Sequence, residues 1–240
     1  MTFVLNILHK DFSLMATDRR GNAEGPITMT VGNITINTTG GGTIDGFKKT
    51  HLNSTQKVAI AIAGQTQAHP YLEEAKEKAS PKEIIDLILD TEKKSFAPND
   101  LEDLLNLKPQ MENSTLVSFY DQVTDSFITS MHIYTRYLNY NNITMRQANP
   151  SAQLLHLGTG SSKFEEAVGL DEINSFIDKM KEDTSVDLIL KWLDMAFEKV
   201  SKIAEGCSAE YDACIITRET QTFTSLRSTN ETRFSPVVAS

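Results

Sequence analysis

The first seventeen residues constrain the fold most strongly. Apolar side chains occupy both odd and even positions of residues 2–9, so the strand that this segment predicts has two apolar faces. A strand of that kind is stable when both of its faces are covered. Residues 12–17 form a second, alternating run, and Lys10-Asp11 between the two suits a tight turn. We therefore expect a hairpin in the interior of a layered core.

Two further segments carry clear local signals. Residues Val58–Ala63 place β-branched side chains on one face of a strand and alanines on the other, which lets another layer approach the alanine face closely. Ser80-Pro81-Lys82-Glu83 predicts the start of a helix, because it combines an N-cap serine, a proline at the first helical position and a capping-box glutamate.

The remaining signals come in groups of strands and groups of helices. Helical patterns cover residues 68–78, 162–168, 171–182 and 185–205, and strand patterns cover residues 27–36, 115–119, 126–134, 153–157, 211–217 and 222–226. Such grouping favours an α+β protein over alternating βαβ units. Because several strands are apolar on both faces, we expect a single domain over residues 1–240, folded as a four-layer αββα sandwich.

Charge and composition exclude several classes of function. The net charge of −9 argues against nucleic acid or an anionic membrane as the main partner. The two cysteines and five histidines show no metal-ligand spacing, so we expect neither a metal nor another cofactor. No apolar run approaches the ~18 residues of a transmembrane helix, and no signal-peptide pattern opens the chain, so we expect a cytoplasmic protein.

Thr2 is the candidate nucleophile. It directly follows Met1, and removal of Met1 would leave a residue with both a hydroxyl group and a free α-amine. Those two groups are the minimal equipment of an N-terminal nucleophile hydrolase. Threonine at the second position is also common by chance. Whether Thr2 is a nucleophile or an incidental second residue therefore depends on the residues that could act with it.

Several residues further along the chain are candidate partners of Thr2. Asp18 and Arg20 follow the second predicted strand, and Lys48-Lys49 precede the strand that ends at Gly64. The turn Gly158-Thr159-Gly160-Ser161 precedes a helix, and Glu205 lies three residues before Ser208. In this order and spacing the chain resembles proteasome β-type subunits and their bacterial relatives.

The resemblance implies a threonine-type peptidase. It implies that Thr2 attacks the peptide carbonyl, that the Thr2 α-amine or Lys49 relays the proton, that Asp18 pairs with Lys49, and that the Gly64 N–H stabilises the oxyanion. The residues it implies as supporting are Arg20, Thr159, Ser161, Glu205 and Ser208. It also implies a homo-oligomeric ring, a peptide or unfolded-protein substrate and, by analogy, an unfoldase partner.

The chain departs from the family pattern in identifiable places. Residues 27–46 are an insertion, which we expect to be a hairpin around Gly32-Asn33 followed by a loop at Gly40–Gly42. The insertion leaves Lys48 and Lys49 as alternatives; we prefer Lys49 and expect Lys48, like Arg19, to be a solvated surface residue. Thr159 and Glu205 replace the usual Ser and Asp. We expect residues 227–240 to be a loosely held tail.

Two other functions fit the same residues. The first is an N-terminal nucleophile amidase that acts on a small amide. The second is a catalytically silent, proteasome-like assembly subunit, which retention of Met1 would favour.

Overall fold

The computed structural model describes residues 2–23, 27–31, 34–38, 42–64, 71–95, 112–135, 140–146, 152–228 and 233–236. Within these residues the protein is a mixed α/β structure built on antiparallel sheets. No helix in this part of the chain is long and apolar enough to cross a membrane.

The predicted N-terminal hairpin forms the middle of the first sheet. Strand β1 (Val4–Leu8) pairs with β2 (Phe12–Asp18), and the N–H of His9 donates to the carbonyl of Phe12 at 2.9 Å across the turn. The sheet continues with β12 (Gln153–Leu157) beyond β1, and with β13 (Tyr211–Thr217) and β14 (Thr224–Arg227) beyond β2. Every residue of β1 and β2 is buried, as their apolar faces require.

The second sheet has the order β11-β10-β9-β8-β7. Its strands are β7 (Thr50–Leu52), β8 (Val58–Ala63), β9 (Glu112–Asp121), β10 (Ser126–Thr135) and β11 (Tyr140–Arg146), of which β11 has no counterpart among the predicted strands. The prediction for β8 is confirmed, because its alanines join the apolar cluster that also contains Val4 and Met15 of the first sheet. Its β-branched residues join a separate cluster with α1 and α2.

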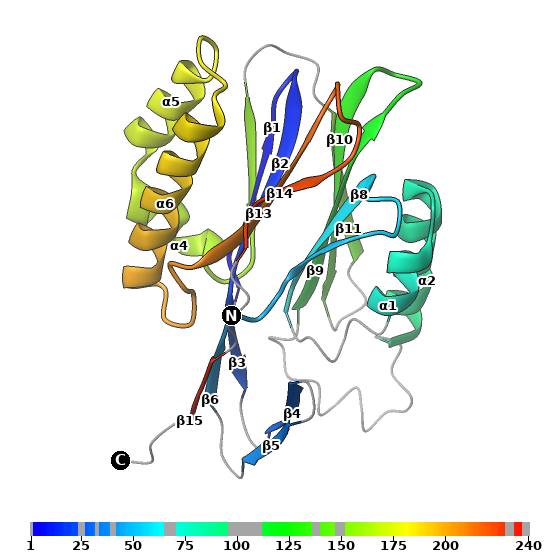
Figure 1. Ribbon diagram of the computed structural model, residues 1–240, viewed down its shortest axis with the longest axis vertical. Helices are drawn as coiled ribbons and strands as arrows, with labels where there is room; N and C mark the ends of the chain where they lie inside the picture. Colours follow the sequence, from blue (N-terminus) through cyan, green and yellow to red (C-terminus); the bar gives the residue numbers. More distant parts are fainter. Residues whose placement is uncertain are drawn as a thin grey trace.

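Helices flank the two sheets. Helices α4 (Ser161–Val168), α5 (Leu170–Lys179) and α6 (Val186–Ile203) cover the outer side of the first sheet, and α1 (Leu72–Glu77) and α2 (Pro81–Ser95) lie beside the second sheet (Figure 1). The predicted capping box of α2 is present, since Glu83 N donates to Ser80 Oγ at 3.3 Å and Ser80 N donates to Glu83 Oε2 at 3.1 Å. The largest apolar cluster fills the space between α4–α6 and the first sheet.

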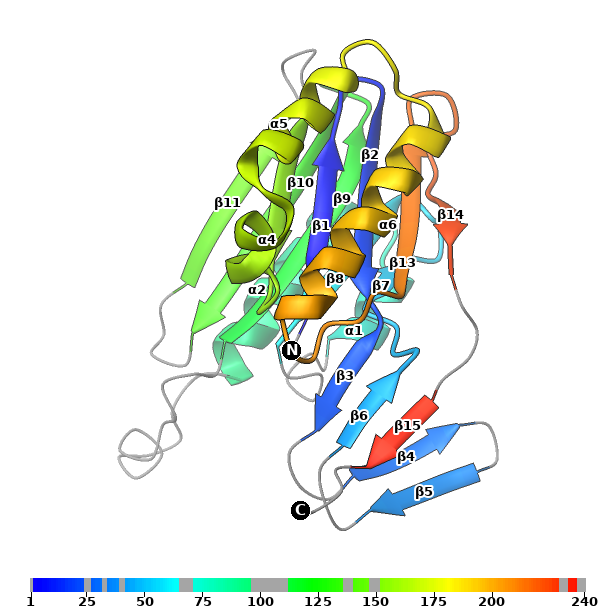
Figure 2. The ribbon, with the colours of Figure 1, turned by 90° about the vertical axis from the view of Figure 1, so that its left-hand side faces the viewer.

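The predicted insertion and tail contain more strand than we expected. Strand β6 (Gly42–Asp45) pairs with β3 (Arg20–Ala23) on one side and with β15 (Arg233–Pro236) on the other, and β4 (Ile27–Val31) pairs with β5 (Ile34–Thr38) as a hairpin. Figure 2 shows these strands together at the lower end of the molecule, beyond the two five-stranded sheets. Gly42 is therefore strand rather than loop, and residues 233–236 of the tail are paired. Gly32, Asn33, Gly40 and Gly41 lie outside the described residues.

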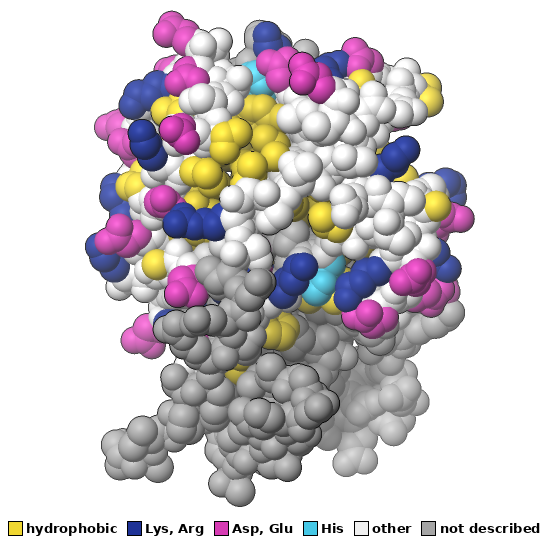
Figure 3. All heavy atoms as spheres, in the orientation of Figure 1, with side chains coloured by type: hydrophobic (Ala, Val, Ile, Leu, Met, Phe, Trp, Pro, Cys, Tyr) yellow, Lys and Arg dark blue, Asp and Glu magenta, His cyan; other side chains and the backbone are white. Residues whose placement is uncertain are grey.

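Side chains of opposite charge alternate over the helices in Figure 3, while hydrophobic side chains gather between the helical layer and the neighbouring strands. Four large hydrophobic side chains stand out as exposed among the described residues: Val123, Leu170, Val186 and Ile203.

Candidate active site

The carboxylate of Asp18 is the centre of a buried polar cluster. Asp18 ends β2 and has no exposed surface. Its Oδ1 accepts from Phe3 N at 2.7 Å and from Lys49 Nζ at 2.6 Å, and its Oδ2 accepts from Arg20 N at 3.1 Å and from Ser208 N at 3.2 Å. The four donors occupy the lone-pair sites of a carboxylate that acts only as an acceptor. Three of them are backbone N–H groups, so the main chain itself fixes this side chain.

Lys49, rather than Lys48, joins this cluster. Lys49 is 2% exposed, and its Nζ also donates to the carbonyl of Arg20 at 2.6 Å. The carbonyl of Lys49 accepts from Ile62 N at 3.1 Å, which ties the lysine to β8 in the second sheet. Burial lowers the pKa of Lys49 below its usual value, although the Asp18 carboxylate acts in the opposite direction. Lys48 is exposed, as predicted.

Thr2 is held by its main chain on two sides. On one side, Phe3 N donates to Asp18 and Phe3 O accepts from Asp18 N at 2.9 Å. On the other side, Thr2 O accepts from Gly160 N at 3.0 Å. Thr2 is 4% exposed in the chain that begins at Met1. The backbone of Thr2 therefore lies between the end of β2 and the turn at residues 158–161.

That turn needs its glycines for space. Gly158 has φ +88°, and a Cβ there would lie 2.3 Å from Thr2 O. A Cβ at Gly160 would lie 2.7 Å from Phe3 Cβ and 3.0 Å from Cys207 Sγ. Real Cβ contacts do not reach these distances, so both glycines let the turn approach the N-terminal strand.

Ser161 closes the turn and has a partner that the sequence did not reveal. Its Oγ lies 2.6 Å from Nδ1 of His156 in β12. Burial lowers the pKa of His156, which favours the neutral imidazole. A histidine five residues before a serine is not a recognised motif, and the pairing of β12 with β1 places His156 opposite Leu5 in the N-terminal strand.

Arg20 and Ser208 act through their backbone as well as their side chains. The guanidinium of Arg20 binds Asp45 with contacts of 2.7 and 3.3 Å, which joins β3 to β6. Ser208 Oγ accepts from Arg19 N at 3.0 Å and donates to Glu210 O at 2.7 Å. Its hydroxyl therefore links the end of β2 to Glu210, while its N–H contacts Asp18.

The expectation for Arg19 is wrong. Arg19 is 4% exposed, its Nη1 forms an ion pair with Asp212, and its Nη2 donates to Gly46 O at 2.7 Å. A charged side chain is buried in this way only when paired. Local sequence gives no sign of this pair, because Asp212 lies 193 residues further along the chain.

The structure does not bring three of the predicted residues into the buried cluster. Thr159 and Glu205 are exposed, and neither side chain forms a hydrogen bond or ion pair within the described residues. Gly64 directly follows the second-sheet strand β8, at an exposed position with φ +112°.

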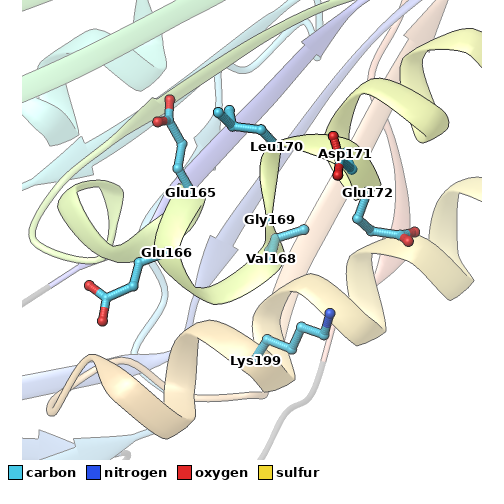
Figure 4. Close-up of a pocket in the computed structure, with 8 residues that line it drawn as sticks. All are labelled: Glu165, Glu166, Val168, Gly169, Leu170, Asp171, Glu172 and Lys199. Carbon is cyan, nitrogen blue, oxygen red and sulfur yellow. The ribbon is translucent and has the colours of Figure 1, made fainter.

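Cys207 borders this site, since its Sγ lies 3.0 Å from the position of a Cβ at Gly160, but its thiol is not suited to the chemistry. Burial raises the pKa of the Cys207 thiol to about 11, which makes it a poor nucleophile. No group of three or more His, Cys, Asp or Glu in the described part of the chain could hold a metal ion. An open hollow of about 800 Å³ lies at the turn between α4 and α5, with Glu165 and Glu166 on α4 and Lys199 on α6 (Figure 4).

Comparison with known proteins finds a solved structure with a similar fold. No family model matches the chain, and no curated protein matches its sequence. Its antiparallel two-sheet structure is nevertheless a proteasome-like fold. A solved structure that shares it is that of the Anbu complex from Pseudomonas aeruginosa, a helical assembly, with a TM-score of 0.58 at 14% identity over 95% of this chain and 87% of that one. At this identity the similarity establishes the fold alone.

Proposed function

We propose that this protein is an N-terminal threonine hydrolase that cleaves peptide bonds, built as a four-layer αββα sandwich. The observation that supports the proposal most strongly is the shared contact at Asp18 Oδ1. That oxygen binds both Lys49 Nζ, at 2.6 Å, and the backbone N–H of the residue that follows Thr2, at 2.7 Å. A buried lysine and the N-terminal residue are thereby held by the same atom.

In the proposed reaction, removal of Met1 exposes the α-amine of Thr2. The amine accepts the proton of Thr2 Oγ while that oxygen forms a bond to the substrate carbonyl, and the proton then passes to the leaving amine. Water hydrolyses the resulting ester and restores Thr2. An α-amine has a pKa of about 8, close to the working pH of a general base.

Lys49 has an electrostatic role in this scheme. Its ammonium group, held by Asp18 and by the Arg20 carbonyl, disfavours a positive charge on the nearby α-amine. The amine then spends more time as a free base. The N–H of Gly64 is the proposed oxyanion donor, and Ser161 and Ser208 support the position of the amine and of Asp18.

A peptide or unfolded protein is the proposed substrate, in the cytoplasm and within a homo-oligomer. The helical assembly of the Anbu complex supports association of subunits with this fold. Exposed Leu170, Val186 and Ile203 on α5 and α6 offer apolar surface for such contacts. An unfoldase partner remains part of the proposal by analogy with other proteasome-like proteins.

The catalytically silent alternative requires that Met1 is retained. Thr2 is only 4% exposed in the chain that retains Met1, so an unprocessed protein would have no accessible nucleophile. The small-amide alternative differs in assembly, because a monomer or dimer has no enclosed chamber to select unfolded chains. Native mass spectrometry distinguishes it from a large assembly.

Matched variants of the two adjacent lysines test the proposal. With Met1 removal verified by intact mass, Thr2→Ala should abolish hydrolysis of a fluorogenic peptide, while Thr2→Ser should retain it because the hydroxyl remains. Lys49→Met should lower the rate by about 10-fold, because without the ammonium charge more of the α-amine is protonated, and Lys48→Met should leave it unchanged. Equal rates for the Thr2→Ala variant and the unaltered protein would refute the proposal.

A further inference from the structure

His156 and Ser161 form a half-buried pair on the side of β1 where β12 lies. His156 lies opposite Leu5 in the pairing of β12 with β1, and its ring packs on Phe164 with 5.1 Å between ring centroids. The ring of Phe164 in turn packs on that of Phe3, with 5.5 Å between ring centroids. The histidine is therefore built into the core that supports the N-terminus, and its Nδ1 points at Ser161 Oγ.

The direction of this contact depends on which nitrogen of the neutral imidazole carries the proton. In the tautomer with its proton on Nε2, Nδ1 accepts from Ser161 Oγ at 2.6 Å, and the carbonyl of His156, 3.4 Å from the same oxygen, is the more distant acceptor. With the hydroxyl proton turned toward His156, the lone pairs of Ser161 Oγ are left to accept a hydrogen bond from another group.

The neighbouring turn brings the N-terminal residue, Thr2, close to the Ser161 hydroxyl. Gly160, the residue before Ser161, donates its N–H to Thr2 O, and the position of a Cβ at Gly158 lies 3.3 Å from Thr2 Cβ. We propose that His156 is a positioning residue that orients the Ser161 hydroxyl to accept from the α-amine of Thr2. The inference rests on the proposed function, since the amine exists only after Met1 is removed.

This arrangement depends on the protonation of His156. When Nδ1 gains a proton it becomes a donor, and the Ser161 hydroxyl loses its acceptor and its orientation. Among the described residues, the charged group that acts on the imidazole is the Glu165 carboxylate of α4, which raises its pKa. Burial outweighs Glu165 and lowers the pKa, so the oriented state is complete at neutral pH and is lost as the pH falls.

A double-mutant cycle separates this role from a structural one. The measured quantity is the rate at which a β-lactone acylates Thr2 in protein without Met1. His156→Ala should lower that rate roughly 5–10-fold, the effect of one lost hydrogen bond. In a Ser161→Ala background the same substitution should have no further effect. Equal losses in both backgrounds would overturn the inference, because His156 would then act through packing alone.

His156→Asn is the conservative control. The Oδ1 of asparagine can occupy the position of Nδ1 and accept from Ser161, but it does not titrate. This variant should recover most of the rate, and below about pH 6.5 its rate should fall less steeply than that of the unaltered protein. A rate no better than that of His156→Ala, or an unchanged pH profile, would contradict the proposed orientation.

Two further outcomes keep the inference distinct from the proposed function. Nitrogen NMR of His156 reports the tautomer without any activity, and a proton on Nδ1 at neutral pH would overturn the inference alone. Failure of the unaltered protein to react at Thr2, despite a free amine, would instead overturn the proposed function and the inference with it. Acylation at Ser161 would assign that serine as a nucleophile and also overturn the positioning role.

Discussion

The two sides of the candidate site differ in how their residues are held. Around Asp18, the carboxylate has no exposed surface, and three of its four donors are backbone N–H groups. At the exposed edge of the site, the side chains of Thr159 and Glu205 have no bonded partner within the described residues. Side chains anchored by the main chain keep one geometry, whereas exposed side chains sample several rotamers. The difference predicts unequal responses to substitution.

The largest effect should come from Asp18→Asn. The substitution leaves the buried ammonium of Lys49 without its counter-charge, and breaking a buried pair in this way costs about 3–5 kcal/mol. The free energy of unfolding measured with urea should fall by that amount, and acylation of Thr2 should be lost. A loss below about 1 kcal/mol would mean that the cluster is far less coupled than its contacts imply.

Gly160→Ala should have the next largest effect. The added methyl group meets Phe3 Cβ at 2.7 Å and Cys207 Sγ at 3.0 Å, and overpacking of this kind costs about 1–3 kcal/mol. Gly169→Ala is the matched control, because a Cβ there meets nothing within 4 Å and any cost comes from its φ of +91°. Acylation of Thr2 should slow only in the Gly160 variant. Equal acylation rates in both would argue against tight packing of the turn on the N-terminal strand.

Ser208→Ala should have an intermediate effect, because it should lower the free energy of unfolding more than the rate of Thr2 acylation. It removes the bonds that Ser208 Oγ forms with Arg19 N and Glu210 O, but Arg19 N still donates to Glu210 O at 3.0 Å, so the free energy of unfolding should fall by only about 1 kcal/mol. The backbone N–H of Ser208 still contacts Asp18, so the acylation rate of the folded variant should change less than about 3-fold. A large loss of rate without loss of stability would instead give the hydroxyl a direct role at the amine.

The smallest effects should come from Glu205→Gln and Thr159→Ala. Both side chains are exposed and unbonded, so each substitution should change the free energy of unfolding by less than about 0.5 kcal/mol. Acylation rates should also stay unchanged. A loss of rate in either variant would show that the exposed side moves inward during the reaction, and the contrast between the two sides would fail.

The same contrast explains what the sequence could reveal. The N-terminal hairpin, the two faces of β8 and the capping box of α2 follow from side-chain alternation or spacing within a few residues. Lys49 could be chosen over Lys48 only by a family resemblance, yet the structure places it at Asp18. These features depend on local chemistry and on short offsets along the chain.

Features that depend on distant pairing could not be read in this way. The ion pair between Arg19 and Asp212 and the contact of His156 with Ser161 arise only after strands have paired. Strands β3, β6 and β15 have four residues each, too few for periodicity to reveal, and β6 finds partners that lie far away on both sides of the sequence. Whether the side chains of Thr159 and Glu205 enter the buried cluster likewise depends on the path of the backbone, which spacing along the sequence does not specify.

The most direct test of the account is to locate the adduct of a β-lactone on protein purified from its own host. We predict an intact mass that lacks Met1 and carries one adduct, and fragmentation that assigns the adduct to an N-terminal peptide beginning at Thr2. Retained Met1 with Thr2 unmodified, or an adduct confined to another residue, would contradict the claim that Thr2 is the nucleophile held by the Asp18–Lys49 pair.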